Sequence, residues 1–233
     1  MAPVIRRAFE RSRCRYAIRF VSAADLGCGS GTFLLHLAQF CHRLYGVDRS
    51  AEMLRLARRK TLGAGVQLLR QDLRDLQLPT RVDLITCNFD TLNYLLRTEG
   101  LQAAIERARD KLREGGHFAF DVITGAGEEG RTRDFIQRIR LPDAVALWRL
   151  RTDGNRRLSH VDMHWSSVGG ARLWREVHVQ RWHSLPRLCT LLNRCGLSIR
   201  GIHDTMSFAP ASSRTWWAHF VTCRDRRRTS EAN

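Results

Sequence analysis

The sequence predicts an α/β fold: a doubly wound, Rossmann-like, mostly parallel seven-stranded sheet that carries an antiparallel β-meander insertion. Two observations lead to this prediction. Along most of the chain, short apolar runs alternate with runs of helical period, which is typical of βαβ units around a parallel sheet. Between residues 143 and 182 the period changes to two, with glycine-containing turns, which is typical of an antiparallel meander.

The parallel part of the sheet is expected before residue 143. A short basic amphipathic helix is predicted near residues 3–16. The first strand is expected to end at Leu26, and further strands are predicted at residues 44–48, 66–72, 82–89 and 116–122. The helices between them are predicted at residues 32–43, 50–62 and 92–113, the last with a break near Gly100. Ser50 is suited to begin the second of these helices, because a serine hydroxyl can accept a backbone N–H of the first turn.

The meander interrupts the core before its last strands. Runs of period two at residues 144–152, 156–168 and 171–182 predict three antiparallel strands. A helix at residues 184–196 and strands at 197–204 and 217–224 are expected to complete the core. The predicted organisation is a short N-terminal helical segment (1–22), a Rossmann-like core (23–142), an inserted β-sheet lid (143–182), the completion of the core (183–225) and a basic tail (226–233).

The charge of the chain leaves two interpretations open. Lys and Arg number 39 against 23 Asp and Glu, a net charge of +16, and lysine occurs only at Lys60 and Lys111. Arginines spread along the chain fit a solvated surface that reflects composition, and they also fit a surface that binds nucleic acid. No run approaches the about 20 apolar residues that span a bilayer. The seven cysteines form no CxxC pair, which argues against a metal site and favours reduced thiols in a cytoplasmic protein.

The glycine-rich stretch DLGCGSGTF, residues 25–33, predicts a ligand-binding loop. A dinucleotide fingerprint requires a third glycine where this chain has Thr32, and a P-loop requires Gly-Lys-Ser/Thr, which is absent. Asp25 stands two positions before Gly27, where a carboxylate repels a pyrophosphate and suits a ligand that carries an ammonium group. The loop therefore favours a cationic or zwitterionic ligand without phosphates.

Two more acids are expected at the same edge of the sheet, where open α/β sheets bind their ligands. Asp48 ends the second strand, and its carboxylate can accept both hydroxyls of a ribose in charge-assisted bonds of about 1.5–3 kcal/mol each. Asp72 ends the third strand and can accept from the amino group of an adenine. Both acids can instead serve as solvated or helix-capping residues, and this alternative stays open.

On these motifs the chain resembles the class I S-adenosylmethionine (SAM)-dependent methyltransferases, from about residue 23 to residue 223. The stretches that carry the resemblance are ADLGCGSGTFLLHLA, LYGVDRSAEMLRLAR, VQLLRQDLRDL, VDLITCNFDTLNYLL and LREGGHFAFDVIT. The resemblance implies SAM as the cofactor and S-adenosylhomocysteine as the product. It implies that the methionine and ribose side is lined by Asp25, Gly27, Gly29 and Gly31, that Asp48 holds the ribose, that Arg49, Met53, Asp72 and Leu73 surround the adenine, and that Asn88 and Phe89 lie beside the transferable methyl group.

The acceptor is expected between the end of the fourth strand and the meander. Asn93 and Tyr94 open the helix after that strand and are predicted to form a pocket wall, with helix packing as the alternative. In the meander, alternation places His160, Asp162 and His164 on one face of one strand, and Trp174, Glu176 and His178 on one face of the next. We interpret these faces as a roof over the methyl group. His178 and Tyr94 are the candidate catalytic residues, with His178 or His160 as proton acceptor; cross-strand pairing on an exposed sheet is the alternative.

Three functions follow from these expectations. The first is methyl transfer to an N or O nucleophile of a small-molecule acceptor, which the resemblance implies. The second is an RNA methyltransferase, which the charge favours. Enzymes that methylate base amines resemble one another in an Asp/Asn-Pro-Pro-aromatic turn after the fourth strand, and NFDTLNY lacks this turn. The third is a non-catalytic methyltransferase-like partner subunit, because the 22 residues before Ala23 have room for only one short helix to close over a cofactor. A homodimer, in which a partner chain supplies that cover, is compatible with the first.

Overall fold

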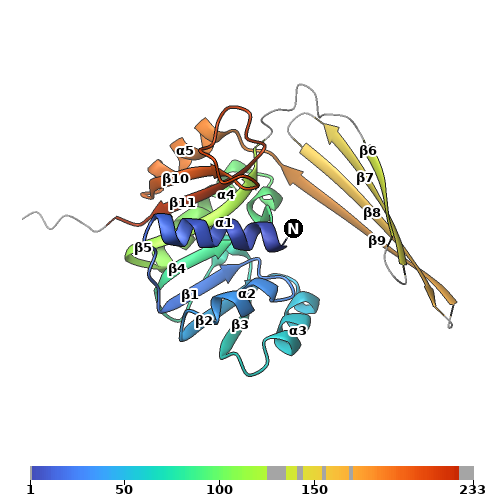
Figure 1. The fold of residues 1–233 in the computed structure, drawn as a ribbon, viewed down its shortest axis with the longest axis horizontal. Helices are drawn as coiled ribbons and strands as arrows, with labels where there is room; N and C mark the ends of the chain where they lie inside the picture. The colour runs from blue at the N-terminus through green and yellow to red at the C-terminus, as the bar shows by residue number, and fades with distance from the viewer. Residues whose placement is uncertain (1, 125–134, 141–143, 154–155, 168–169, 226–233) are drawn as a thin grey trace, which may run out of the picture.

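A computed structural model describes residues 2–124, 135–140, 144–153, 156–167 and 170–225. The core is a seven-stranded sheet, as predicted, and its strand order is β10-β11-β5-β4-β1-β2-β3 (Figure 1). The neighbouring strands β3, β2, β1, β4 and β5 run parallel to one another, and β11 is antiparallel to both of its neighbours, β5 and β10. The strands of this sheet are β1 (Ser22–Leu26), β2 (Arg43–Asp48), β3 (Val66–Arg70), β4 (Val82–Cys87), β5 (Leu112–Ile123), β10 (Ser198–Asp204) and β11 (Trp217–Cys223).

Helices cover both faces of the sheet, because successive residues of its buried strands point to opposite sides. Ala24 of β1 belongs to one apolar cluster and Ala23 to the other. The first cluster includes residues of α4 and α5, and the second includes residues of α1, α2 and α3. The helices are α1 (Ala2–Arg15), α2 (Thr32–Leu37), α3 (Ala51–Lys60), α4 (Thr98–Lys111) and α5 (Leu185–Arg194), and two 3₁₀ turns are η1 (Leu73–Asp75) and η2 (Thr91–Tyr94).

Two helices differ from their predicted spans. α2 ends at Leu37 rather than at residue 43, because the chain must return within a few residues to begin β2, where Arg43 pairs with Ser22. The helix expected at 92–113 is broken between Tyr94 and Thr98, and Gly100 lies inside α4. The break is stabilised by a tertiary contact, since an Arg181 N–H donates to the Leu96 carbonyl at 2.8 Å.

The insertion is a separate antiparallel sheet of four strands, which Figure 1 shows projecting from the core as an arm. Three strands were expected, and an additional one, β6, precedes them, so the insertion begins by Phe135 rather than at residue 143. The expected basic tail, residues 226–233, lies outside the described ranges. Within those ranges, no helix is long and apolar enough to cross a bilayer. The strands of the inserted sheet are β6 (Phe135–Arg140), β7 (Ala144–Asp153), β8 (Arg156–Ser167) and β9 (Gly170–Arg181).

Candidate active site

The three glycines of the loop after β1 have different structural roles. All three adopt positive φ, with values of 68°, 52° and 81° for Gly27, Gly29 and Gly31. A Cβ on Gly27 would lie 2.4 Å from the Thr91 side chain, and one on Gly31 would lie 3.1 Å from Ala57 Cβ. Gly27 therefore allows the loop to pack on η2, and Gly31 allows α2 to pack on α3. A Cβ on Gly29 would meet no atom within 4 Å, so its backbone is the open side of the loop.

Asp48 connects the glycine loop to the end of β2. Gly29 N donates to Asp48 Oδ2 at 2.9 Å, and Ser50 N donates to Oδ1 at 2.8 Å. Ser50 in turn caps α3, as predicted, by accepting from Met53 N. Each carboxylate oxygen has a second lone pair, so Asp48 can still accept hydroxyl groups from a ligand. The carboxylate thus lies beside the open glycine at the predicted edge of the sheet.

Asp25 lies beneath this loop, on β1. Its side chain is only 3% exposed, and Thr86 Oγ1 donates to its Oδ1 at 2.7 Å. Burial raises the pKa of Asp25 to about 7, with a further increase from the charges of Asp48 and Asp121. This hydrogen bond joins β1 to β4 beside the loop, and direct contact of Asp25 with a ligand stays a prediction.

Asn88 follows β4 and carries a buried donor for which the described part of the chain supplies no acceptor. The side chain is 3% exposed, and its Nδ2 forms no hydrogen bond among the described residues. A buried N–H left without a partner costs about 1–3 kcal/mol, so a ligand that supplies an acceptor oxygen fits this position. Together with the open backbone at Gly29 and the carboxylate of Asp48, the unpaired amide meets the requirements of a polar, zwitterionic ligand such as SAM.

The residues expected around an adenine line the carboxyl ends of β2 and β3. Asp72 caps η1 by accepting from Arg74 N at 2.9 Å, and its Oδ2 forms an ion pair with the Arg74 guanidinium at 2.7 Å. Hydrogen bonding to Arg74 lowers the pKa of Asp72, so its carboxylate is charged at neutral pH. Met53 is 40% exposed, Arg49 is exposed, and Leu73 is half-buried. Their contact with an adenine stays a prediction.

The structure brings the two candidate catalytic residues together. The Tyr94 hydroxyl lies 3.0 Å from His178 Nδ1, and the two rings meet edge to face with centroids 5.9 Å apart. His178 Nε2 lies 3.1 Å from Glu176 Oε2. A carboxylate can only accept, so Nε2 carries the proton and Nδ1 accepts from the tyrosine O–H. The sequence analysis placed Glu176 on the same face as His178, as part of the expected roof, but gave it no role of its own.

Asn93 does not have the role that the sequence suggested. It is fully buried, and its Nδ2 donates to the carbonyls of Ile123 and Arg181 at 2.9 and 2.7 Å. Its Oδ1 accepts from Ile123 N at 3.0 Å. Asn93 therefore joins η2 to the ends of β5 and β9, and this structural role replaces the predicted pocket wall.

The register of the inserted sheet separates His160 from His178. Ser159 pairs with His178, and His160 pairs with Val177. Directly paired residues share a face, so positions 160 and 178 belong to opposite faces of the sheet. The His160 side chain lies outside the described residues, and so do those of His164 and Trp174. The single roof that we expected from His160 and His178 is thus wrong, because the register places the two positions on opposite faces.

Asp121 is a site residue that the sequence analysis missed. It is fully buried near the end of β5 and accepts from Phe89 N at 2.8 Å, Asp90 N at 2.6 Å and Trp217 Nε1 at 3.0 Å. Burial raises the pKa of Asp121 to about 7. An acid inside the apolar run HFAFDVI was a signal that could have identified it.

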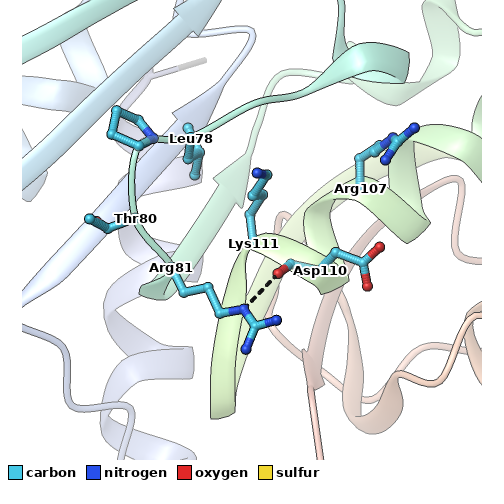
Figure 2. Close-up of a pocket in the computed structure, with 7 residues that line it drawn as sticks. Leu78, Thr80, Arg81, Arg107, Asp110 and Lys111 are labelled. Carbon is cyan, nitrogen blue, oxygen red and sulfur yellow. Dashed lines mark hydrogen bonds between the residues drawn. The ribbon is translucent and has the colours of Figure 1, made fainter.

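A cavity of about 410 Å³ lies at the opposite edge of the sheet, between the segment before β4 and the end of α4 (Figure 2). There an Arg81 N–H donates to the Asp110 carbonyl at 3.2 Å. The cavity lies at the amino ends of β4 and β5, away from the glycine loop, and takes no part in the site described above. It is lined by Leu78, Pro79, Thr80, Arg81, Arg107, Asp110 and Lys111.

Comparisons with known proteins find similar methyltransferases. Residues 23–116 match the family described as "Methyltransferase domain". The chain is similar to dTDP-3-amino-3,6-dideoxy-alpha-D-glucopyranose N,N-dimethyltransferase of Streptomyces fradiae, with 37% identity over 93 residues, or 40% of this chain and 36% of that protein. The match thus covers little more than a third of that relative's length.

Two further comparisons extend over most of the chain. Cypemycin N-terminal methyltransferase of Streptomyces sp is 24% identical over 192 residues, which are 82% of this chain and 78% of that protein. Among solved structures, an S-adenosylmethionine-dependent methyltransferase from Clostridium acetobutylicum ATCC 824 superposes with a TM-score of 0.87 at 20% identity, covering 96% of this chain and 92% of that chain. This last likeness establishes the fold.

Proposed function

We propose that this chain, whose residues 23–116 match the "Methyltransferase domain" family, is a class I SAM-dependent methyltransferase that transfers a methyl group from SAM to the nitrogen of a small-molecule amine. The observation that carries the proposal is the hydrogen-bonded set of Tyr94, His178 and Glu176 at the edge of the sheet that also holds the glycine loop. Methyl transfer to an amine that arrives protonated requires a proton acceptor, because an ammonium group has no lone pair for attack.

The cofactor would be held by residues at the carboxyl ends of three neighbouring strands of the sheet, β4, β1 and β2. SAM supplies, when bound, an electrophilic methyl group and leaves as S-adenosylhomocysteine. Asp48 is suited to accept the ribose hydroxyls, and the open backbone at Gly29 admits the ligand closely. The unpaired Nδ2 of Asn88 is suited to donate to an oxygen of the ligand. These are the same residues that the family resemblance assigned to the cofactor.

The proton of the acceptor ammonium has a defined route in the chain's own residues. The Tyr94 oxygen accepts it while the Tyr94 hydroxyl proton passes to His178 Nδ1, which lies 3.0 Å away. The imidazolium that forms is stabilised by the Glu176 carboxylate, which holds Nε2–H at 3.1 Å. The nitrogen is thereby left with a lone pair for attack, and Tyr94 remains neutral. The remainder of the catalysis is positioning, for which well-oriented reactants gain roughly 7–11 kcal/mol.

The relatives support an amine rather than a hydroxyl acceptor. One is named for N,N-dimethylation of an amino sugar nucleotide and the other for the N-terminus of cypemycin, and both names point to a nitrogen acceptor. For this chain we propose a small amine that fits between η2 and β9, the elements that carry Tyr94 and His178.

The proposal is tested with purified protein and SAM labelled in its methyl group. Amino sugar nucleotides, short peptides with a free N-terminus and fractionated cell extract are offered separately, and the products are divided into metabolites, protein and RNA. We expect label on a small amine, and none with Asp48→Ala. Label in the RNA fraction alone would establish the nucleic-acid alternative instead. Binding of SAM without transfer to any fraction would indicate the non-catalytic subunit.

A further inference from the structure

The turn after β4 has a backbone conformation that its residues do not favour. Phe89 and Asp90 follow each other with φ values of 61° and 50°, in the left-handed region that side chains disfavour. Neither is a glycine, and two such residues in succession persist only where their surroundings hold them. The turn joins Asn88, with its unpaired amide, to η2, which carries Tyr94.

The side chain of Asp121 holds this turn through its backbone. Its Oδ2 accepts from Phe89 N at 2.8 Å and its Oδ1 from Asp90 N at 2.6 Å, so both left-handed residues donate to one carboxylate. Trp217 Nε1 donates to the same Oδ1 at 3.0 Å and fixes the carboxylate from β11. Asp121 is fully buried, which excludes water as a substitute for these bonds.

The same turn is fastened on its other side to the inserted sheet. Gln180 Nε2 donates to Asp90 Oδ2 at 2.6 Å. Gln180 lies in β9 two residues after His178, on the same face of the strand, and is only 6% exposed. Asp90 therefore connects two parts of the site: its backbone is tied to β5 and its side chain to the strand that carries His178.

From this arrangement we infer that Asp121 is a positioning residue. It holds Phe89 and Asp90 in the left-handed conformation and thereby places Asn88 beside the cofactor. Through Asp90 and Gln180 it also places His178 beside Tyr94. The inference rests on the proposed function. It goes beyond that function because Asp121, which is part of neither the cofactor side nor the acceptor side, aligns the two sides with each other.

The test replaces Asp121 by asparagine, which keeps the shape but places an NH₂ group opposite a backbone N–H. Amide hydrogen exchange at Phe89 and Asp90 is expected to become about tenfold faster, because one hydrogen bond of about 1.4 kcal/mol corresponds to that factor. In calorimetry, the Kd for S-adenosylhomocysteine is expected to rise about fivefold or more, since Asn88 moves with the turn. Asp25→Asn is the matched control, a second buried carboxylate made neutral, and is expected to leave exchange at Phe89 and Asp90 unchanged.

The wild-type protein itself provides a second measurement that does not depend on the variant folding. The amides of Phe89 and Asp90 are expected to exchange as slowly as those of the flanking strand, although they lie in a turn. Fast exchange there in the wild type, or unchanged ligand affinity in a folded Asp121→Asn with accelerated exchange, would overturn the inference. If wild-type protein binds no S-adenosylhomocysteine but shows the slow exchange, the proposed function fails while the role of Asp121 in holding the turn stands.

Discussion

The hydroxyl oxygen of Tyr94 lies 3.0 Å from Nδ1 of His178, across 84 residues of sequence. The two side chains come from different units of the fold, a 3₁₀ turn of the core and the last strand of the inserted sheet. Asn93, next to Tyr94, binds the carbonyls of Ile123 and Arg181 and so fixes both units at this point. The contact is therefore built into the join between core and insertion, which is where an acceptor must be held if the insertion selects it.

Replacing Tyr94 by phenylalanine tests the proton route. The ring can still pack on His178, but no oxygen remains to accept the ammonium proton, so kcat for the amine acceptor is expected to fall about 100-fold at neutral pH. The loss is expected to shrink as the pH rises, because an acceptor that is already neutral needs no base. Initial rates between pH 6.5 and 9.5 measure both effects.

A matched control exists elsewhere in the chain. Tyr16 also forms a hydrogen bond with a histidine, His203 of β10, outside the set of Tyr94, His178 and Glu176. Tyr16→Phe is expected to leave kcat and its pH dependence unchanged. If Tyr94→Phe lowers kcat by the same factor at every pH, the hydroxyl orients the acceptor without taking its proton.

Glu176→Gln tests the stabilisation of the imidazolium. The glutamine oxygen can still accept from His178 Nε2, but it carries no charge, and kcat is expected to fall about tenfold, as for the loss of one charge-assisted interaction. Because Glu176 acts through His178 on Tyr94, the substitution is expected to add little further loss in the Tyr94→Phe background. A double-mutant cycle of kcat values measures this coupling, and fully additive losses would separate Glu176 from the route.

The strands, and the edge of the sheet to which the predicted cofactor residues belong, could be predicted because they depend on local patterns. Apolar runs locate the strands, and parallel strands bring Asp48, Asp72 and Asn88 to one edge whatever the details of packing. The arrangement of the acceptor side depends on register and on tertiary hydrogen bonds, which the pattern does not contain. Alternation within a strand related Glu176 to His178, but only the pairing between strands shows which histidines share a face.

The polar residues after β4 show the same limit. An asparagine in a helix-like run has the same appearance whether it faces a pocket or binds three buried backbone groups, as Asn93 does. The apolar run around Asp121 marked it as unusual, but its role depends on the left-handed backbone of Phe89 and Asp90, whose amides it binds. Sequence patterns do not reveal that conformation in residues other than glycine.

The glycines of the loop are expected to respond differently to alanine. Gly29→Ala places a Cβ in open space, so the protein loses only the roughly 1–2 kcal/mol of a left-handed alanine, but its affinity for S-adenosylhomocysteine falls because the methyl group stands where the ligand approaches. Gly27→Ala adds a clash with Thr91 and is expected to lower the melting temperature further. Thermal unfolding with and without S-adenosylhomocysteine measures both effects.

The Thr91 clash provides an internal check. A Cβ added at Gly27 would lie 2.4 and 2.7 Å from Thr91 Cγ2 and Oγ1, whereas the Thr91 Cβ would be 3.1 Å away. Thr91→Ala is therefore expected to restore part of the stability that Gly27→Ala loses and none of the affinity that Gly29→Ala loses. Equal effects of both glycine variants on ligand affinity would remove the distinction between them.

Asp48→Ala is expected to weaken SAM binding by well over tenfold in calorimetry, since two charge-assisted ribose hydrogen bonds are lost at roughly 1.5–3 kcal/mol each. Asp83 provides the control, because its carboxylate also accepts two backbone N–H groups, from Val21 and Ser22, but at the other edge of the sheet. Asp83→Ala is expected to lower stability and leave SAM affinity unchanged. Unchanged affinity in Asp48→Ala would remove Asp48 from the site.

The buried Asp25 predicts a dependence of stability on pH. Its pKa is about 7 in the folded protein and near the ordinary value of 3.8 in the unfolded chain, so between about pH 4 and pH 7 the folded state binds more protons. The contribution of Asp25 to the free energy of unfolding is therefore present at low pH and lost as the pH rises toward 7, at up to about 1.4 kcal/mol per pH unit.

Asp25→Asn keeps an oxygen for the Thr86 hydroxyl but cannot ionise. Urea unfolding between pH 4.5 and 8.5 is expected to show the variant gaining stability relative to wild type up to pH 7 and running parallel above it. A constant difference over the whole range would mean that Asp25 is already ionised in the folded protein at pH 4.5.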